Sequence, residues 1–314
     1  MKKYMLLLLC SLGILLSHAQ TKRTLLYSGS PATKFDLVFM GDGFTSSQQG
    51  EFNELVEEHF KAIFTYENGG MDNVFAELQD AFNVHRVNMN SSASGVSDQI
   101  CTKKDNCGVS STVNRNTPYR FKYSGCWNCC WMTWDNNSMT RVNNALQNVG
   151  LLGAEYIVMI LNESSGGGCR RGNVVAITKS SSSRVLLHEL GHSIGNLADE
   201  YGSKDECYGG SNTPRRNMDT NTNNSKWNKF ARASITTGIP REYNVSQSGH
   251  FEGGMYVTRC IYRPSTNSTM RGNTNLFNPP SYDELWKRNK PRSRYNFNKV
   301  HTGNFGGSNH SDVL

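Results

Sequence analysis

Several features of multidomain and low-complexity proteins are missing from this chain of 314 residues. Only 8 residues are proline, and no proline-rich or serine-rich stretch has the composition of a linker between two domains. There is no evident internal repeat and no long block of charge. The composition therefore indicates a globular protein with one large domain, or two small ones not separated by a linker.

Signatures of other enzyme classes are missing as well. The glycines of "ESSGGGCRRG" (163–172) are not followed by Gly-Lys-Ser/Thr, which excludes a phosphate-binding loop. There is no Gly-x-Ser-x-Gly elbow and no persuasive cysteine–histidine pair. Net charge is +7, partly from basic residues between positions 284 and 299. We expect these to be a solvated surface segment, because a nucleic-acid site would need a more organised basic face.

The first residues, "MKKYMLLLLCSLGILLSHAQ", have the pattern of a signal peptide. Two lysines precede an apolar run, and small residues flank a cleavage site after Ala19. The run is too short to predict a membrane span, and Cys10 is a poor lipoprotein cysteine because Leu9 precedes it. We expect 1–19 to be removed, and the mature chain to be secreted, periplasmic or on the cell surface, without an integral membrane segment.

Eight cysteines remain after removal of the signal peptide, and an even number in an exported chain favours disulfide bonds. Cys101 and Cys107 are close enough to close a local loop, whereas the adjacent Cys129 and Cys130 are expected to bond different partners. "CWNCC" (126–130) lacks a second cysteine or histidine pair at the spacing of a zinc finger, so disulfides are favoured over a metal there.

Alternating strand and helix patterns predict an α/β fold, with a twisted sheet packed against helices. We expect a short extension over 20–34 and a catalytic domain over 35–300, with one lobe to about residue 195 and a loop-rich lobe after it. Residues 301–314 form a tail, and the active-site cleft lies between the lobes. Strands are expected at 35–44, 82–90, 154–162 and 172–179, and helices at 46–64, 139–150 and 183–195.

The stretch "HELGHSIGNLADEY" (188–201) contains the chemistry that points to function. His188 and His192 are four residues apart on the expected helix, so both imidazoles leave one face and can bind one zinc ion. Glu189 comes close to the open position of the metal, where it can take a proton from zinc-bound water and pass it to a leaving amine. Gly195 is expected to end the helix and turn the chain back.

The stretch resembles the metzincin pattern, but Ala198 stands where the third ligand is expected. Together with "DLVFMGDGF", "FNVHRVNMNSSASGVSD", "AEYIVMILNESSGGG" and "GHFEGGMYVTRCIYRPSTNSTMR", it is similar to the bacterial IgA-peptidase family of zinc metallopeptidases. The resemblance spans roughly 35–280. It implies a metzincin-like zincin with one catalytic Zn²⁺ and endopeptidase activity on a protein or glycoprotein.

Carried onto this chain, the resemblance makes His188 and His192 zinc ligands and Glu189 the general base. Asp199 is preferred as the third ligand, with Glu200 as the alternative, since a one-residue adjustment of the turn suits the shorter side chain. In that case Glu200 is expected to bind a histidine ring N–H behind the ligand. His250 is a further candidate ligand, although a surface position is the commoner fate of such a histidine.

Further residues have expected roles. Met270 resembles the Met-turn beneath a metzincin zinc site, with an ordinary core methionine as the alternative. Tyr201 and Tyr256 are candidates to donate to the transition-state oxyanion or contact substrate, although packing competes with this role. Asp42, in "GDGF", is expected to form a turn.

Taken together, these patterns predict a monomeric, secreted metalloendopeptidase. The alternatives are a catalytically silent secreted binding or adhesion domain that keeps the fold, and a zinc hydrolase that cleaves another bond. The intact Glu189 argues against the silent domain.

Overall fold

The structure is a computed structural model that describes residues 20–65, 74–103, 106–124, 132–211, 215–228, 249–272, 274 and 276–293. The expected signal peptide, the C-terminal tail and the cysteines at 126, 129 and 130 lie outside the described residues. Within the described chain, no helix is both long and apolar enough to cross a membrane.

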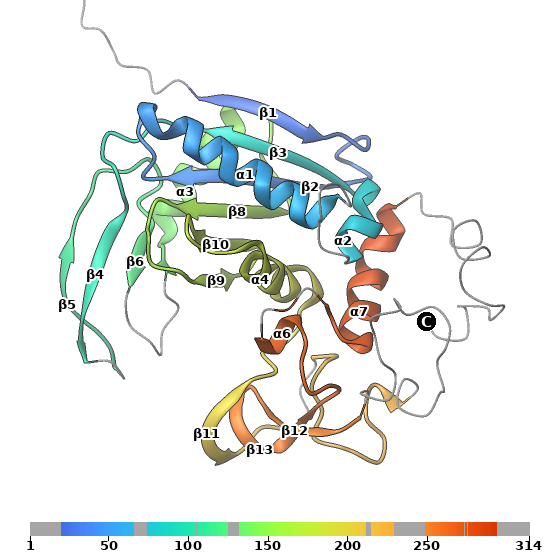
Figure 1. The fold of residues 1–314 in the computed structure, drawn as a ribbon. Helices are drawn as coiled ribbons and strands as arrows, with labels where there is room; N and C mark the ends of the chain where they lie inside the picture. Colours follow the sequence, from blue (N-terminus) through green and yellow to red (C-terminus); the bar gives the residue numbers. More distant parts are fainter. Residues whose placement is uncertain are drawn as a thin grey trace, which may run out of the picture.

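The predicted α/β architecture is confirmed (Figure 1). Six of the described strands form the main sheet. In sheet order they are β1 (Thr21–Leu26), β3 (Phe82–Asn88), β2 (Phe35–Asp42), β8 (Tyr156–Leu161), β10 (Val174–Thr178) and β9 (Gly168–Arg171). The central four strands are parallel, and β1 and β9 join the two edges antiparallel. These four are the strands that the sequence predicts, because parallel strands covered on both faces consist of nearly continuous apolar residues.

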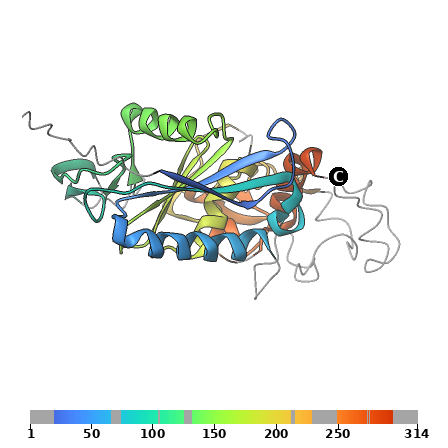
Figure 2. The ribbon, with the colours of Figure 1, turned by 90° about the horizontal axis from the view of Figure 1, so that it is seen from above.

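Helices cover both faces of this sheet, as the view from above shows (Figure 2). One face packs on α1 (Gln49–Phe64), α2 (Val74–Glu77), α4 (Ser183–Gly195) and α7 (Pro279–Asn289), and the other on α3 (Asn136–Asn148). The helix predictions at 46–64, 139–150 and 183–195 correspond to α1, α3 and α4. In α1, Phe52, Val56 and Ile63 are buried at helical spacing and face the core.

The N-terminal segment differs from its prediction. Residues 20–34 were expected to be an extension outside the domain, but β1 within them pairs with β3 as an edge strand of the main sheet. Its sequence, "TKRTLL", is mostly exposed and polar. An edge strand with little burial lacks the apolar alternation by which strands are recognised.

A second described sheet lies beyond one end of the main sheet, in the order β5-β4-β6-β7. Its strands are β4 (Ser97–Lys103), β5 (Asn106–Val113), β6 (Lys122–Ser124) and β7 (Met132–Thr133). The loop before β6 is fixed by Asp42, at the end of β2. The Asp42 carboxylate accepts hydrogen bonds from the Thr117 hydroxyl at 3.0 Å and from the amides of Tyr119 and Phe121 at 3.1 and 2.8 Å.

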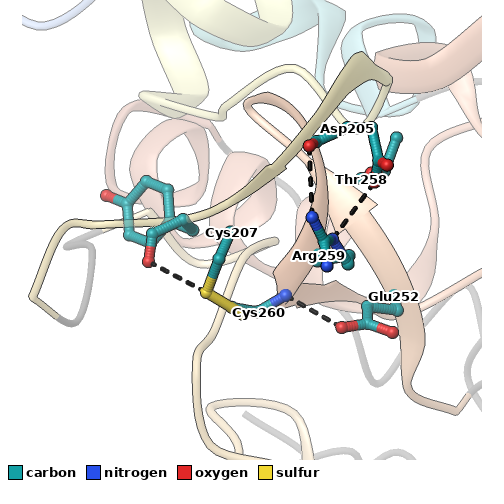
Figure 3. Close-up of a disulfide and its surroundings, with 7 residues drawn as sticks. Asp205, Cys207, Glu252, Thr258, Arg259 and Cys260 are labelled. Atoms are coloured by element: carbon teal, nitrogen blue, oxygen red, sulfur yellow. Dashed lines mark hydrogen bonds and ion pairs between the residues drawn. A yellow bond between two sulfur atoms is a disulfide. The ribbon is translucent and has the colours of Figure 1, made fainter.

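The chain after Tyr201 contains more regular structure than the expected loops. A third described sheet has the order β11-β13-β12, formed by β11 (Gly202–Cys207), β13 (Tyr256–Arg263) and β12 (Phe251–Gly254), and is followed by α6 (Thr269–Gly272) and α7. A disulfide bond between Cys207 and Cys260 joins β11 to β13 (Figure 3). Cys169 is also disulfide-bonded. The prediction that cysteines form disulfides is therefore confirmed for these three.

Basic residues of the segment near the C-terminus form ion pairs within α7 and with a residue distant in the sequence. Lys287 and Arg288 pair with Asp283 and Glu284 one turn earlier on α7, and Arg292 pairs with Glu155. Lys287 and Arg288 are also exposed, which agrees with the expected surface segment.

Candidate metal centre

Helix α4 holds the His-Glu-x-x-His sequence between the main sheet and the segment after it (Figure 1). Leu186, Leu187, Leu190 and Ile194 are buried in the core of that face and fix the rotation of the helix. The opposite side of α4, with the two histidines, therefore points away from the sheet and toward the chain that follows.

The end of α4 differs in detail from its prediction. Gly195 is the last helical residue, and Asn196 adopts the left-handed conformation, with φ of 50°. Asparagine tolerates this conformation better than most residues. Gly195 is instead required for close packing, because a Cβ there would lie 2.9 Å from Cγ of Leu197 and 2.9 Å from Cδ2 of Leu285.

The turn after α4 brings Asp199 back to both histidines. Oδ1 of Asp199 lies 3.0 Å from Nε2 of His188 and 3.2 Å from Nε2 of His192, and the two Nε2 atoms are 3.0 Å apart. Ligand atoms around a tetrahedral zinc, with bonds of about 2.1 Å, are separated by roughly 3.4 Å. The three side chains thus converge as a metal-binding group.

Hydrogen bonds on the far side of each ring define which nitrogens face the cluster. Nδ1 of His188 lies 2.9 Å from the Thr269 carbonyl oxygen, and Nδ1 of His192 lies 2.8 Å from that of Leu197. A carbonyl can only accept, so both Nδ1 atoms carry a proton, and each Nε2 presents a lone pair to the cluster when its ring is neutral. Two lone pairs and a carboxylate oxygen converge on one point, and this donor set fits a divalent cation such as Zn²⁺.

The cluster attracts positive charge, which either protons on the rings or a bound cation would supply. Burial disfavours a charged ring at His188, but the hydrogen bond to Asp199 and the charge of Glu189 outweigh it and raise the pKa of His188 to about 9. Burial acts to raise the pKa of Asp199, but hydrogen bonds from His188 and His192 hold it well below its usual range. The space between the three side chains therefore favours positive charge.

Glu189 is buried beside this cluster and against strand β9. A Cβ on Gly168 of β9 would lie 2.7 Å from Oε1 of Glu189, so only glycine leaves room for the carboxylate. Burial raises the pKa of Glu189, and the positive ends of His188 and His192 oppose that rise. A carboxylate with an elevated pKa next to a metal-binding group is suited to accept and return a proton. No sequence motif marks Gly168 for this role, which follows only from the contact between β9 and α4.

Glu200 does not join the cluster. Its fully buried carboxylate accepts hydrogen bonds from Asn217 at 2.9 Å, Asn278 at 2.7 Å and the Ser268 hydroxyl at 2.6 Å. The expectation that Glu200 binds a histidine ring N–H is wrong, because backbone carbonyls occupy both Nδ1 atoms. Adjacent residues of an extended chain point to opposite sides, so Asp199 faces the histidines and Glu200 the interior.

Met270 lies beneath α4 and is fully buried. Its sulfur would be 2.6 Å from a Cβ on Gly191, the residue before His192, so the methionine packs directly against the helix backbone. The amide of Glu200 donates to the Met270 carbonyl at 2.9 Å, and the preceding residue, Thr269, holds His188. The segment is therefore in contact with the cluster from below.

Most of this chain is similar to one known protein family. A family model described as IgA peptidase M64 matches residues 24–247, well over half of the sequence. The chain belongs to the IgA peptidase M64 family. The resemblance seen in the sequence is confirmed. No curated protein is similar enough to this chain to count as a match.

Membership in the M64 family indicates a peptidase whose substrate is a protein. The matched region includes His188, Glu189, His192 and Asp199, and it begins inside β1. Met270 and Tyr256 lie beyond it.

Two tyrosines of this M64 peptidase lie beside the cluster. The Tyr201 ring stacks at 6.4 Å from the His188 ring and contacts Tyr256 edge-on at 5.4 Å. Tyr256 donates from its hydroxyl to Oδ2 of Asp199 at 2.5 Å. Both tyrosines are substantially exposed, at 40% and 52%. They therefore reach both the cluster and solvent, a position that fits the expected contact with substrate.

His250 lies away from the cluster. Its Nε2 is 2.8 Å from the Ser225 hydroxyl oxygen, and its ring packs on Trp227. The described contacts thus give His250 a local structural role, and they place it with neither His188 nor His192.

Proposed function

We propose that this chain is an exported, zinc-dependent endopeptidase of the M64 family that hydrolyses peptide bonds in proteins or glycoproteins. His188, His192 and Asp199 are the metal ligands, and Glu189 is the general base. The observation that carries the proposal is the convergence of two imidazole lone pairs and one carboxylate oxygen within 3.0–3.2 Å of one another.

When bound by these three groups, Zn²⁺ would supply a Lewis acid that polarises the scissile carbonyl and makes water a better nucleophile at neutral pH. Glu189 takes the proton of the attacking water and delivers it to the amine nitrogen of the leaving peptide. Burial supports this role, because an elevated pKa lets Glu189 hold a proton between the two transfers. Tyr201 is a candidate to donate to the developing oxyanion, whereas Tyr256 already donates its hydroxyl proton to Asp199.

The proposal extends to the wider architecture. The fold is metzincin-like, with Met270 as the Met-turn methionine and the active-site cleft between the sheet-containing lobe and the chain after about residue 195. Residues 1–19 are a signal peptide, the catalytic domain extends to about residue 300, and the enzyme acts as a monomer. Support comes from the contact of Met270 with Gly191 and from the disulfide between Cys207 and Cys260.

The test is metal content measured together with proteolysis of casein and immunoglobulin. We expect one zinc per chain in the wild type and in Glu189→Ala, activity only in the wild type, and loss of zinc in Asp199→Ala. A chelator is expected to abolish cleavage. Zinc that remains in a folded Asp199→Ala variant would contradict the ligand assignment, and cleavage by Glu189→Ala would contradict the general base.

A zinc-containing wild type that cleaves no protein would instead favour the silent binding domain. Conversion of a small ester or glycan, without cleavage of any protein, would favour a hydrolase of another bond.

A further inference from the structure

Strand β9 has two faces with different surroundings. In the antiparallel register, Gly168 pairs with Ile177 of β10 and Arg170 pairs with Val175. Ile177 and Val175 belong to the core on the α4 face. Residues paired across a ladder point to the same side of a sheet, so Gly168 and Arg170 also point to the α4 face.

The contacts of β9 with α4 locate Arg170 along the helix. Gly168 abuts Val185 and Glu189, and the Gly172 carbonyl oxygen lies 3.5 Å from the Ser193 hydroxyl. Val185, Glu189 and Ser193 are four residues apart and form one ridge of α4. Arg170 therefore lies beside the stretch of this ridge between Glu189 and Ser193, on the C-terminal side of the general base.

Arg170 is half-buried and has few partners. Its Nε donates to the Gly172 carbonyl at 2.8 Å. Within the described part of the chain, its two terminal nitrogens make no hydrogen bond and it forms no ion pair. Glu189 and Arg215 are its main electrostatic neighbours. Arg215 is held at the end of α4 by the Asn196 carbonyl oxygen, at 2.9 Å, so a second positive charge reinforces the first.

We propose that Arg170 is a specificity-determining residue that binds a carboxylate of the substrate peptide close to the scissile bond. The inference rests on the proposed peptidase function and identifies its substrates as peptides with an acidic group near the cleavage point. A guanidinium binds a carboxylate through two parallel hydrogen bonds, and the terminal nitrogens of Arg170 provide that geometry. The carboxylate is either an aspartate or glutamate side chain or the C-terminus of a short peptide.

The position of Arg170 limits where that carboxylate lies in the peptide. Gly168 lies directly beside Glu189. Arg170 is two residues further along β9, so its Cα is roughly 7 Å from that of Gly168. In this proposal the substrate peptide adds to the edge of the sheet beside β9 as a further strand, so its carboxylate lies within about two residues of the scissile bond. Without Arg170, the negative charge of Glu189 would repel an acidic group there.

The experiment compares quenched fluorescent peptides that carry Glu or Gln at each position within three residues of the scissile bond. A separate pair has a free or an amidated C-terminus, and it distinguishes the two sources of the carboxylate. Cleavage by wild type, Arg170→Gln and Arg170→Lys is measured as kcat/KM. Binding of the same peptides to the zinc-loaded Glu189→Ala variant and to its Arg170→Gln double variant is measured by fluorescence anisotropy.

We expect the wild type to prefer one acidic peptide over its neutral partner by at least about tenfold, as a charge-assisted hydrogen bond provides. The ratio should fall toward one in Arg170→Gln and be partly kept in Arg170→Lys. Arg171→Gln is the matched control: it removes the same charge from the next residue of β9, which points to the opposite face and donates to the Trp134 carbonyl. Its ratio should equal that of the wild type.

The outcomes separate this inference from the proposed function. Efficient cleavage with equal rates for all Glu and Gln partners, and for both C-termini, overturns the role of Arg170 while the peptidase stands. The same is true if Arg170→Gln and Arg171→Gln lower the ratio equally. A third outcome is that no peptide is cleaved, but the acidic peptide binds more tightly than its neutral partner and Arg170→Gln abolishes this difference. That outcome supports the Arg170 site and overturns the peptidase.

Discussion

The hydroxyl of Tyr256 donates to Oδ2 of Asp199 at 2.5 Å, while Oδ1 of the same carboxylate faces the two histidines. The backbone that presents this tyrosine is unusual, because Met255 and Tyr256 both have positive φ, at 50° and 71°. Backbone hydrogen bonds hold it in place, from Met255 to the Asp199 carbonyl and from Tyr256 to the Tyr201 carbonyl. A strained pair of residues is thus maintained where it orients a proposed metal ligand.

Tyr256→Phe should therefore weaken zinc binding by about 10- to 100-fold, as loss of a hydrogen bond behind a ligand typically does. The measurement is competition for zinc with a chromophoric chelator. Tyr262→Phe, on the same strand β13, is the control. Equal zinc affinities for Tyr256→Phe and the wild type would show that Asp199 is oriented without the tyrosine.

Gly168→Ala should lower kcat strongly while zinc content stays the same. The new Cβ would lie 2.7 Å from Oε1 of Glu189, so the carboxylate must move, and a displacement of about 1 Å costs roughly 100-fold in rate. Steady-state kinetics and metal analysis of one preparation test this. Gly166→Ala, where a Cβ meets nothing within 4 Å, is the control. Full activity in Gly168→Ala would refute a tight fit between Glu189 and β9.

Glu200→Ala should destabilise the protein by about 3 kcal/mol, because it removes one acceptor from each of the buried amides of Asn217 and Asn278. Glu200→Gln should cost less, about 1 kcal/mol, since an amide oxygen still accepts from both. Urea unfolding of the metal-free protein gives these values. Both folded variants should keep zinc. Loss of zinc from folded Glu200→Gln would argue that Glu200, and not Asp199, is the ligand.

The burial of Asp42 should make the free energy of unfolding depend on pH. Burial, opposed by hydrogen bonds from Tyr119, Phe121 and Thr117, raises the pKa of Asp42 from 3.8 to about 6. The folded state therefore holds the proton more tightly than the unfolded state. The contribution of Asp42 to the free energy of unfolding is complete below pH 4 and falls by about 3 kcal/mol as pH rises through 6.

This contribution is isolated by comparing the wild type with Asp42→Asn in urea unfolding between pH 4 and pH 7, in the presence of a chelator. The free energy of unfolding of the wild type, relative to that of Asp42→Asn, should fall as pH rises. A difference that is the same at all pH values would mean that the pKa of Asp42 is the same in the folded and unfolded states.

Breaking the disulfide between β11 and β13 should lower the stability of the domain. Its two cysteines are 53 residues apart, and a loop of this size corresponds to about 4 kcal/mol in the chain-entropy account. The double variant Cys207→Ser/Cys260→Ser should therefore melt well below the wild type in the absence of reductant. With reductant the two melting temperatures should converge, apart from effects of Cys169. A double variant as stable as the oxidised wild type would contradict this.

The sequence predicts the parts of this structure that depend on local spacing. His188 and His192 follow from helical periodicity, and the four parallel strands follow from apolar runs. The choice between Asp199 and Glu200 is different. The two acidic residues are adjacent in the sequence, so their spacing from the histidines does not distinguish them. The left-handed Asn196 and the amides that surround Glu200 decide which way each side chain points. Those amides come from distant segments, so the sequence alone leaves both open.

Short edge strands are the other part that sequence patterns miss. β9 contains one glycine and two arginines, so it has no apolar alternation, and within the described residues it pairs only with β10. For α7, a signal was present: Asn278 caps the helix and Pro279 begins it, a combination typical of helix starts. The polar composition of the surrounding chain obscured it.

The span of chain between the proposed metal ligands has a consequence for folding. His188 and Asp199 are only 11 residues apart, so closing this loop costs little conformational entropy. Thr269 and Tyr256, which steady these side chains, are 81 and 57 residues away from their partners. The proposed zinc ion would therefore be captured by a nascent helix and turn, before the C-terminal segment docks. Refolding with metal present should then be faster than refolding without it, since the ion stabilises a local nucleus on which slower, long-range contacts assemble.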